Sequence, residues 1–125
     1  TVHILIVDDE DIVRQTLGDY LQELGYQVDY AVDGSAGLKA VEANTYSLAL
    51  VDIRLPGMDG LSLLRHIRSI HPEMPVIILT GHGDPSMSEE ALALGATDFL
   101  YKPIKLLDLD ALLDRLGPGL SPDSR

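Results

Sequence analysis

The chain has 125 residues, a length that suits one domain, and its 20 acidic and 9 basic side chains give a formal net charge of −11. The absence of cysteine excludes disulfides and thiolate metal sites, and no segment reaches the roughly 18 uninterrupted apolar residues of a membrane span. The negative charge repels nucleic-acid phosphates, so we do not expect this domain to bind DNA or RNA by itself.

Short apolar runs alternate along the chain with segments in which apolar residues recur every three or four positions. The first pattern predicts strands that are buried on both sides, and the second predicts amphipathic helices. In chain order we expect a strand at 3–7, a helix at 11–25, a strand at 26–32, a helix at 35–43, a strand at 47–52, a helix at 61–70, a strand at 75–80, a helix at 86–95, a strand at 98–102 and a helix at 106–116.

Five strand–helix units in a row predict an α/β fold, with one parallel sheet and helices on both of its faces. The near-continuous apolar runs at 4–7 and 76–79 fit strands that are covered on both sides. Residues 1–117 are expected to form this domain. The segment at 118–125 is rich in Pro, Gly and Ser, and we expect it to be a flexible tail or the start of a linker to an output domain.

Polar side chains follow four of the expected strands, at the point where each strand ends. The carboxyl ends of parallel strands meet at one edge of a sheet, and ligands bind at that edge, so we expect these side chains to lie together. They are Asp8, Asp9 and Glu10 after the first strand, Asp52 at the end of the third, Thr80 and Gly81 at the fourth, and Lys102 with Pro103 at the fifth.

The expected cluster brings several negative charges close together, and their repulsion has to be offset. At about 4 Å and an effective dielectric of about 20, each pair of like charges repels by about 4 kcal/mol. Lys102 supplies one positive charge, and hard oxygen ligands suit Mg²⁺, which binds carboxylates together with phosphate oxygens. Asp52 is then placed to form an aspartyl phosphate, with Thr80 and Lys102 contacting the phosphoryl oxygens. The turn at Pro56-Gly57 keeps the Asp52 carboxylate at the solvent edge.

Each of these residues also has a simpler interpretation when it is taken alone. The acidic run at 8–10 favours the amino end of a helix through the helix dipole. Lys102 is then a surface lysine and Thr80 a strand-end residue, while Asp59-Gly60 is expected to begin a helix rather than to bind a ligand. It is the combination of four strand ends with matched chemistry that indicates a site.

Four segments, in this order and spacing, resemble the receiver domain of bacterial two-component response regulators: "ILIVDDE", "LVDIRLPGMDG", "VIILTGHGD" and "GATDFLYKPI". The resemblance covers residues 3 to about 116. It implies a flavodoxin-like (βα)5 fold with strand order 2-1-3-4-5. It also implies a phosphoryl-accepting signalling switch, in which Asp52 takes a phosphoryl group from a sensor histidine kinase in a Mg²⁺-dependent reaction.

The resemblance assigns roles around Asp52. Asp9, Asp52 and the backbone carbonyl of Arg54 are expected to bind Mg²⁺ directly, and Asp8 through a water molecule, with Mn²⁺ as an alternative ion. Lys102, Thr80 and the amide of Gly81 are expected to contact the phosphoryl oxygens.

The resemblance also implies a conformational switch, formed by Thr80 and Phe99. Phenylalanine lacks the hydroxyl that many relatives carry there, and a plain core aromatic is the simpler interpretation. The expected output surface lies on the helix at 86–95, the strand at 98–102 and the helix at 106–116, with Met87, Leu92 and Tyr101 among its residues. Lys102-Pro103 is the candidate for a cis peptide bond.

Two positions, Arg54 and His82, are expected to tune the lifetime of the phosphate. A solvated loop histidine is the equally simple interpretation of His82.

Three other functions compete with the phosphoryl-accepting switch. A phosphatase with an aspartyl nucleophile typically carries an acid two residues after the nucleophile, where this chain has Arg54, so we do not expect an enzyme beyond self-catalysed phosphoryl transfer and dephosphorylation. A flavin site needs a Ser-, Thr- or Gly-rich loop where this chain has acidic residues 8–11. The third alternative is a phosphorylation-independent receiver-like interaction module.

The partners implied are a sensor histidine kinase, a C-terminal output domain and a phosphorylation-linked homodimer. The implied location is cytoplasmic, with transcription regulation as an output.

Overall fold

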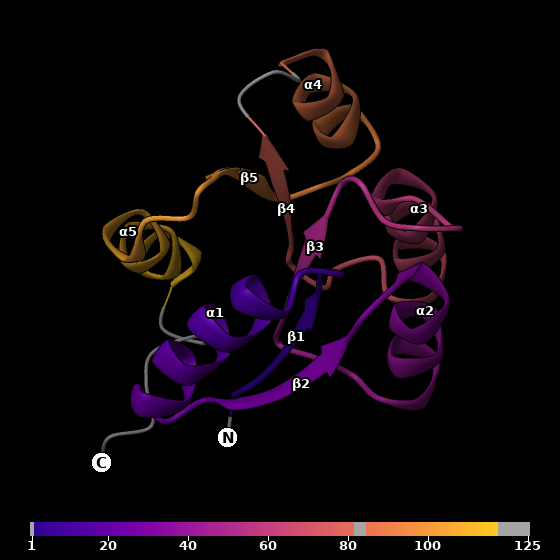
Figure 1. Ribbon diagram of the computed structural model, residues 1–125. Coiled ribbons are helices and arrows are strands. Elements are labelled where there is room, and N and C mark those ends of the chain that lie inside the picture. Colours follow the sequence, from indigo (N-terminus) through magenta and orange to yellow (C-terminus); the bar gives the residue numbers. More distant parts are fainter. Residues whose placement is uncertain (1, 82–84, 118–125) are drawn as a thin grey trace.

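The computed structural model describes residues 2–81 and 85–117, which form one five-stranded parallel sheet flanked by helices (Figure 1). The strands lie in the order β2-β1-β3-β4-β5, which confirms the predicted topology. In chain order the elements are β1 (His3–Val7), α1 (Asp11–Glu23), β2 (Gln27–Ala31), α2 (Gly34–Ala43), β3 (Leu48–Asp52), α3 (Gly60–Ile70), β4 (Val76–Gly81), α4 (Pro85–Ala93), β5 (Asp98–Lys102) and α5 (Leu106–Leu116).

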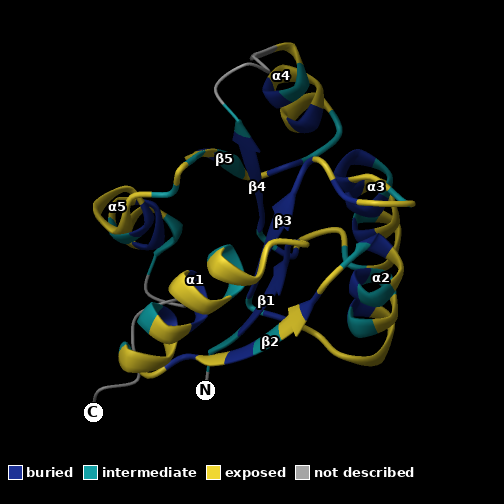
Figure 2. Ribbon diagram, in the orientation of Figure 1, coloured by how far each residue is buried: buried dark blue, intermediate teal, exposed yellow. Residues whose placement is uncertain are grey.

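The helices divide into two layers, one on each face of the sheet. Helices α1 and α5 cover one face, and α2, α3 and α4 cover the other (Figures 1 and 2). Alternate residues of each inner strand enter the two cores, so Ile4 and Ile6 pack toward α1 and α5, and Leu5 and Val7 toward the other layer. Coverage on both faces explains why the inner strands are continuous apolar runs.

The observed boundaries differ from the expected ones by a few residues at most. Strands β1 and β5 and helix α5 begin and end where they were predicted. The helix expected to extend to Gly25 ends at Glu23, and Gly25 follows with a φ of 98°, the left-handed conformation that commonly ends helices. Asp59 caps α3, because its side chain accepts a hydrogen bond from the Ser62 N–H at 2.8 Å, so its interpretation as a helix start is confirmed.

Arg68 of α3 connects three segments at the amino edge of the sheet. Its Nε donates a hydrogen bond to the Gly95 carbonyl at 2.7 Å, just after α4. Its Nη1 donates to the Met74 carbonyl at 2.7 Å and to the His71 carbonyl at 3.3 Å. The carboxyl end of α4 is therefore attached to the end of α3 by a charged, partly buried side chain.

The path of the chain creates a crevice at the carboxyl edge of the sheet. The chain passes from β1 outward to β2, and then crosses back over β1 to β3. The loops that leave β1 and β3 consequently turn to opposite faces, which is where open α/β sheets bind ligands. Within residues 2–81 and 85–117 no helix has the length and apolarity to cross a membrane. The predicted tail at 118–125 lies outside the described residues.

Candidate functional site

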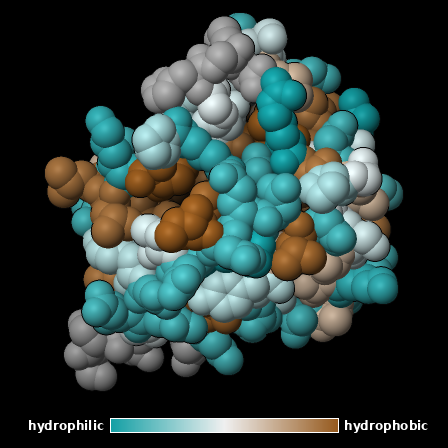
Figure 3. All heavy atoms as spheres, viewed as in Figure 1, coloured by the Kyte–Doolittle hydropathy of each residue, from teal (hydrophilic) through white to brown (hydrophobic). Residues whose placement is uncertain are grey.

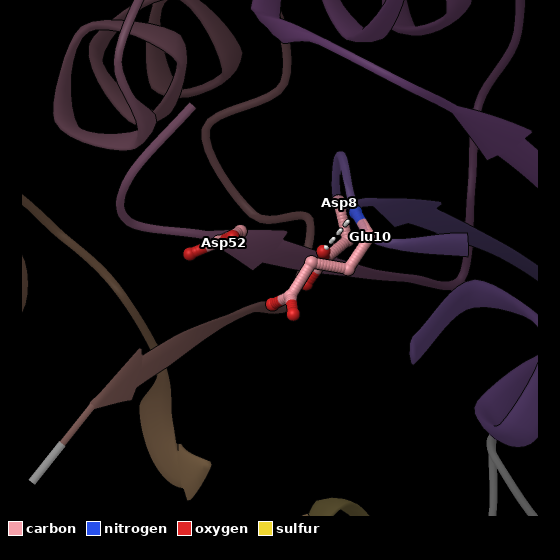
Figure 4. A group of neighbouring side chains, drawn as sticks. All are labelled: Asp8, Glu10 and Asp52. Carbon is pink, nitrogen blue, oxygen red and sulfur yellow. Dashed lines mark hydrogen bonds between the residues drawn. The ribbon is translucent and has the colours of Figure 1, made fainter. Parts of the chain in front are cut away.

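Three carboxylates meet at the crevice between the ends of β1 and β3 (Figure 4). Asp8 directly follows β1 and is 0% exposed, and Asp52 is the last residue of β3 and is 6% exposed. Glu10 precedes the first turn of α1 and is exposed. One oxygen from each of the three lies within 4.8 Å of the others.

The local backbone holds the two buried carboxylates in place. Asp8 Oδ1 accepts a hydrogen bond from the Glu10 N–H at 2.9 Å, and Asp52 Oδ1 accepts one from the Arg54 N–H at 3.0 Å. In both cases the backbone N–H two residues further on donates to the aspartate side chain, a pattern that stabilises tight turns. The second oxygen of each aspartate therefore remains directed into the crevice.

Lys102 enters the same crevice from the end of β5. Its Nζ donates hydrogen bonds to Glu10 Oε1 at 2.8 Å and to Asp52 Oδ2 at 3.0 Å, and it forms an ion pair with Asp8 Oδ2 at 2.8 Å. Burial alone would lower the pKa of Lys102, but the bonds to these carboxylates outweigh it and raise the pKa above its ordinary value, so the ammonium stays charged. Burial raises the pKa of Asp8 against the opposing effects of Lys102 and the Glu10 N–H.

The oxygen set fits a hard divalent cation. Three carboxylates share the single Lys102 ammonium, whose Nζ lies 2.8 Å from Asp8 Oδ2, 2.8 Å from Glu10 Oε1 and 3.0 Å from Asp52 Oδ2. Carboxylates gathered this closely repel one another, and a divalent ion would offset the negative charge that one lysine does not balance. Mg²⁺ is suited to carboxylate and carbonyl oxygens in a site that stays open on one side for phosphate.

The loop after β3 brings α3 into close contact with Asp52. Gly57 adopts a φ of +73°, the left-handed conformation that favours glycine. The Gly60 N–H donates to the Ile53 carbonyl at 3.0 Å, and a Cβ at Gly60 would lie 2.4 Å from the Asp52 carbonyl oxygen. Only glycine fits this approach, which fixes the backbone that carries the candidate phosphoacceptor.

The two predicted switch residues lie on neighbouring strands. Thr80 is fully buried at the end of β4, and its Oγ1 contacts the Gly81 carbonyl at 3.4 Å. Phe99 of β5 is partly buried against the core under α2, α3 and α4, and its ring meets that of Tyr101 edge-on at a centroid distance of 5.3 Å. Phe99 therefore contributes to the core, as its simpler interpretation predicted, at a position one strand away from Thr80.

The structure brings together Asp8, Asp52 and Lys102 as expected, but it places other predicted residues less centrally. Asp9 is exposed and lies outside the group of three acids that approach within 4.8 Å, and Arg54 is exposed at the loop surface. The peptide bond between Lys102 and Pro103 is cis. His82 lies outside the described residues.

Glu10 was expected at this edge of the sheet together with Asp8 and Asp9, but the sequence assigned it no role, and its contact with Lys102 was not predicted. The available signal was its position two residues after Asp8, which brings it back toward the crevice when the chain turns.

A flavodoxin-like sheet with paired buried aspartates, a buried threonine and a lysine at its carboxyl edge defines a phosphoryl-accepting regulatory domain. The chain matches the family model described as the response regulator receiver domain over residues 4–114, and it belongs to that family.

Several relatives share this region. The chain is 36% identical to the transcriptional regulatory protein FixJ of Bradyrhizobium diazoefficiens over 112 residues, which are 90% of this chain and 55% of FixJ. It is 39% identical to the two-component response regulator PhoP of Pseudomonas aeruginosa over 113 residues, 90% of this chain and 50% of PhoP. The crystal structure of the NtrX receiver domain from Brucella abortus superposes with a TM-score of 0.85 at 36% identity, covering 90% of this chain and 96% of that one. The chain thus spans about half the length of these two curated relatives.

Proposed function

We propose that Asp52 is the phosphoacceptor of this receiver domain. The observation that carries the proposal is the position of the Asp52 carboxylate, which lies at the carboxyl edge of the sheet, close to a second buried aspartate and 3.0 Å from the Lys102 ammonium. An Asp52 oxygen attacks the phosphorus of a phosphohistidine, the P–O bond forms as the P–N bond breaks, and the electron pair of the broken bond returns to the imidazole nitrogen. The lysine stabilises the charge on the transferred group.

The surrounding residues supply the remaining contacts. Asp8, Asp9, Asp52 and the carbonyl of Arg54 would hold Mg²⁺, or Mn²⁺ in its place, and Glu10 lies beside them. When bound, the metal neutralises charge on the phosphoryl oxygens. Thr80, Lys102 and the Gly81 amide contact those oxygens. Arg54 and His82 set how readily water reaches the aspartyl phosphate.

The output surface consists of α4, β5 and α5. It exposes large apolar side chains, with Leu92 at 42%, Tyr101 at 37% and Leu107 at 82%. Phosphorylation draws the Thr80 hydroxyl toward the phosphate, Phe99 repacks, and the surface shifts between two populations. Met87 is partly buried, and we assign it to the core side of α4.

The partners follow from the family. A sensor histidine kinase phosphorylates the domain, and residues 118–125 lead to a C-terminal output domain. Transcription regulation is the output that the similarity to FixJ favours, because FixJ is a transcriptional regulatory protein and this chain covers 55% of its length. A phosphorylation-linked homodimer and a cytoplasmic location complete the proposal. The domain acts as a regulator, with self-catalysed phosphoryl transfer and dephosphorylation as its chemistry.

Incubation with acetyl phosphate and Mg²⁺ tests the proposal. We expect the intact mass to increase by one phosphoryl group, and peptide mapping after borohydride reduction to locate the group on Asp52. Asp52→Asn should abolish the increase, whereas Asp59→Asn, which changes the acid that caps α3 in the same loop, should keep it. Full labelling of the Asp52 variant would contradict the assignment. A wild-type protein that takes no label would favour the phosphorylation-independent interaction module.

A further inference from the structure

Glu10 contacts Lys102 from a position unlike those of the two aspartates. Its Oε1 lies 2.8 Å from Nζ, while 54% of its side chain remains exposed to solvent. Lys102 is the partner of this carboxylate among the residues that the structure describes. The contact joins the start of α1 to the end of β5, two segments that are 92 residues apart in sequence.

The lysine ammonium is fully engaged in this arrangement. An ammonium group has three N–H donors. Two are donated to Glu10 and Asp52, and Asp8 Oδ2 lies 2.8 Å away on the remaining side. A phosphoryl oxygen attached to Asp52 can therefore gain a hydrogen bond from Lys102 only after one carboxylate gives up its contact.

Glu10 is the carboxylate that can leave most easily. Asp8 and Asp52 are buried, and each is fixed by a backbone N–H. The Glu10 carboxylate is half in water, where a released charge is hydrated at once, and exposed ion pairs are weak. The Glu10 side chain is also flexible, and it can turn outward without any movement of the backbone.

We infer that Glu10 is a positioning residue for phosphoryl transfer, which holds Lys102 among the acids before phosphorylation and releases it to the incoming phosphoryl group. The inference rests on the proposed role of Asp52. It assigns Glu10 an action through Lys102 and not on the metal. Removing the Glu10 charge should therefore make the Lys102 ammonium more readily available to the incoming phosphoryl group.

Release of Glu10 also changes a neighbouring surface. Glu10 and Lys102 stand at one end of a groove of about 450 Å³ between α1 and the segment after β5, lined by Ile12, Val13, Leu17, Pro103 and Ile104. Figure 3 shows hydrophobic side chains over α1 and α5 on this face. The groove carries a neutralised ion pair before phosphorylation and a free carboxylate afterwards.

The test compares Glu10→Gln with Asp11→Asn in the whole chain. Both remove one negative charge from neighbouring residues, but Asp11 is exposed and pairs with Arg14 instead of Lys102. With acetyl phosphate and Mg²⁺, we expect Glu10→Gln to label about 2- to 5-fold faster than Asp11→Asn, the factor expected for a half-exposed ion pair. Beryllofluoride, a phosphoryl mimic, should bind more tightly by a similar factor.

Two further readouts separate positioning from other roles. The side-chain ¹⁵N resonance of Lys102 should shift in Glu10→Gln and stay in place in Asp11→Asn. Mg²⁺ affinity, measured by calorimetry, should be similar in the two variants. Equal labelling and equal beryllofluoride binding in the two variants would overturn the inference, as would a much larger loss of Mg²⁺ affinity in Glu10→Gln, which would make Glu10 a metal ligand. A wild-type chain that takes no label on Asp52 ends both proposals, whereas a labelled wild type with indistinguishable variants ends only this one.

Discussion

Replacing Lys102 by methionine should destabilise the domain while preserving its fold. Methionine keeps the aliphatic stem and removes the ammonium, so Asp8 and Asp52 are left buried without a cation. Breaking a buried ion pair costs about 3–5 kcal/mol. We expect the lower end, about 3 kcal/mol, because the Lys102 side chain is 19% exposed and water can enter beside it. With an unfolding entropy of about 2.1 cal/mol/K for each of 125 residues, this lowers Tm by about 11 °C.

The assay is thermal unfolding followed by circular dichroism, first with a chelator and then with Mg²⁺. A divalent ion should restore part of the lost stability, because it neutralises the same oxygens. Adding Asp8→Asn to the methionine variant should also raise Tm, because it removes one of the two unpaired charges. If the methionine variant melts at the wild-type temperature in chelator, and Asp8→Asn leaves its Tm unchanged, the carboxylates do not depend on Lys102 and the electrostatic account of the site is wrong.

Three further predictions concern the stability of the domain. Burial raises the pKa of Asp8, so the stability that its protonated form contributes is complete below about pH 4 and is lost as the pH rises through the pKa of the folded state. Asp8→Asn should remove this loss from the free energy of unfolding, measured by urea denaturation at a series of pH values. Burial and a hydrogen bond to Asp29 raise the pKa of Tyr46 to about 12, so the stability of the domain should fall between about pH 10 and 12. Tyr46→Phe should remove that fall and should lower the free energy of unfolding by about 1 kcal/mol at pH 7, as measured by denaturant midpoints. Gly60→Ala should cost about 2–3 kcal/mol, because its Cβ meets the Asp52 carbonyl at 2.4 Å and neither backbone can yield; an unchanged denaturation midpoint would contradict this.

The sheet was predictable because its signals are local and strong. The run Ile4–Val7 is apolar at every position and is fully buried, and the strand order was implied by the receiver resemblance of four short segments. The sequence predicted that a helix begins at Asp59-Gly60, but not what Gly60 contacts. The close approach of Gly60 to Asp52 depends on how the loop after β3 folds back, which is a tertiary contact without a local pattern.

The sequence predicted the site residues whose position is determined by the end of a strand. It did not predict the side chains whose direction is determined by a turn. Asp8, Asp52 and Lys102 meet because each ends a strand at the same edge. The directions of Asp9 and Glu10 depend on the turn made by the Asp8 carboxylate and the Glu10 N–H. Composition and spacing do not reveal that bond, so the sequence identified the acidic run but did not show which of its members reaches the lysine.

The attachment of Arg68 to Gly95 determines how α4 is able to move. The helix spans Pro85–Ala93, and its far end is fastened to α3 and to the start of β4 through one guanidinium. A helix that is attached at one end responds to a force on its other end by pivoting about the attachment, and not by sliding along its axis. Any displacement that begins beside Thr80 should therefore be converted into a change of helix tilt, which moves the exposed Leu92 little and the opposite end of the helix the most.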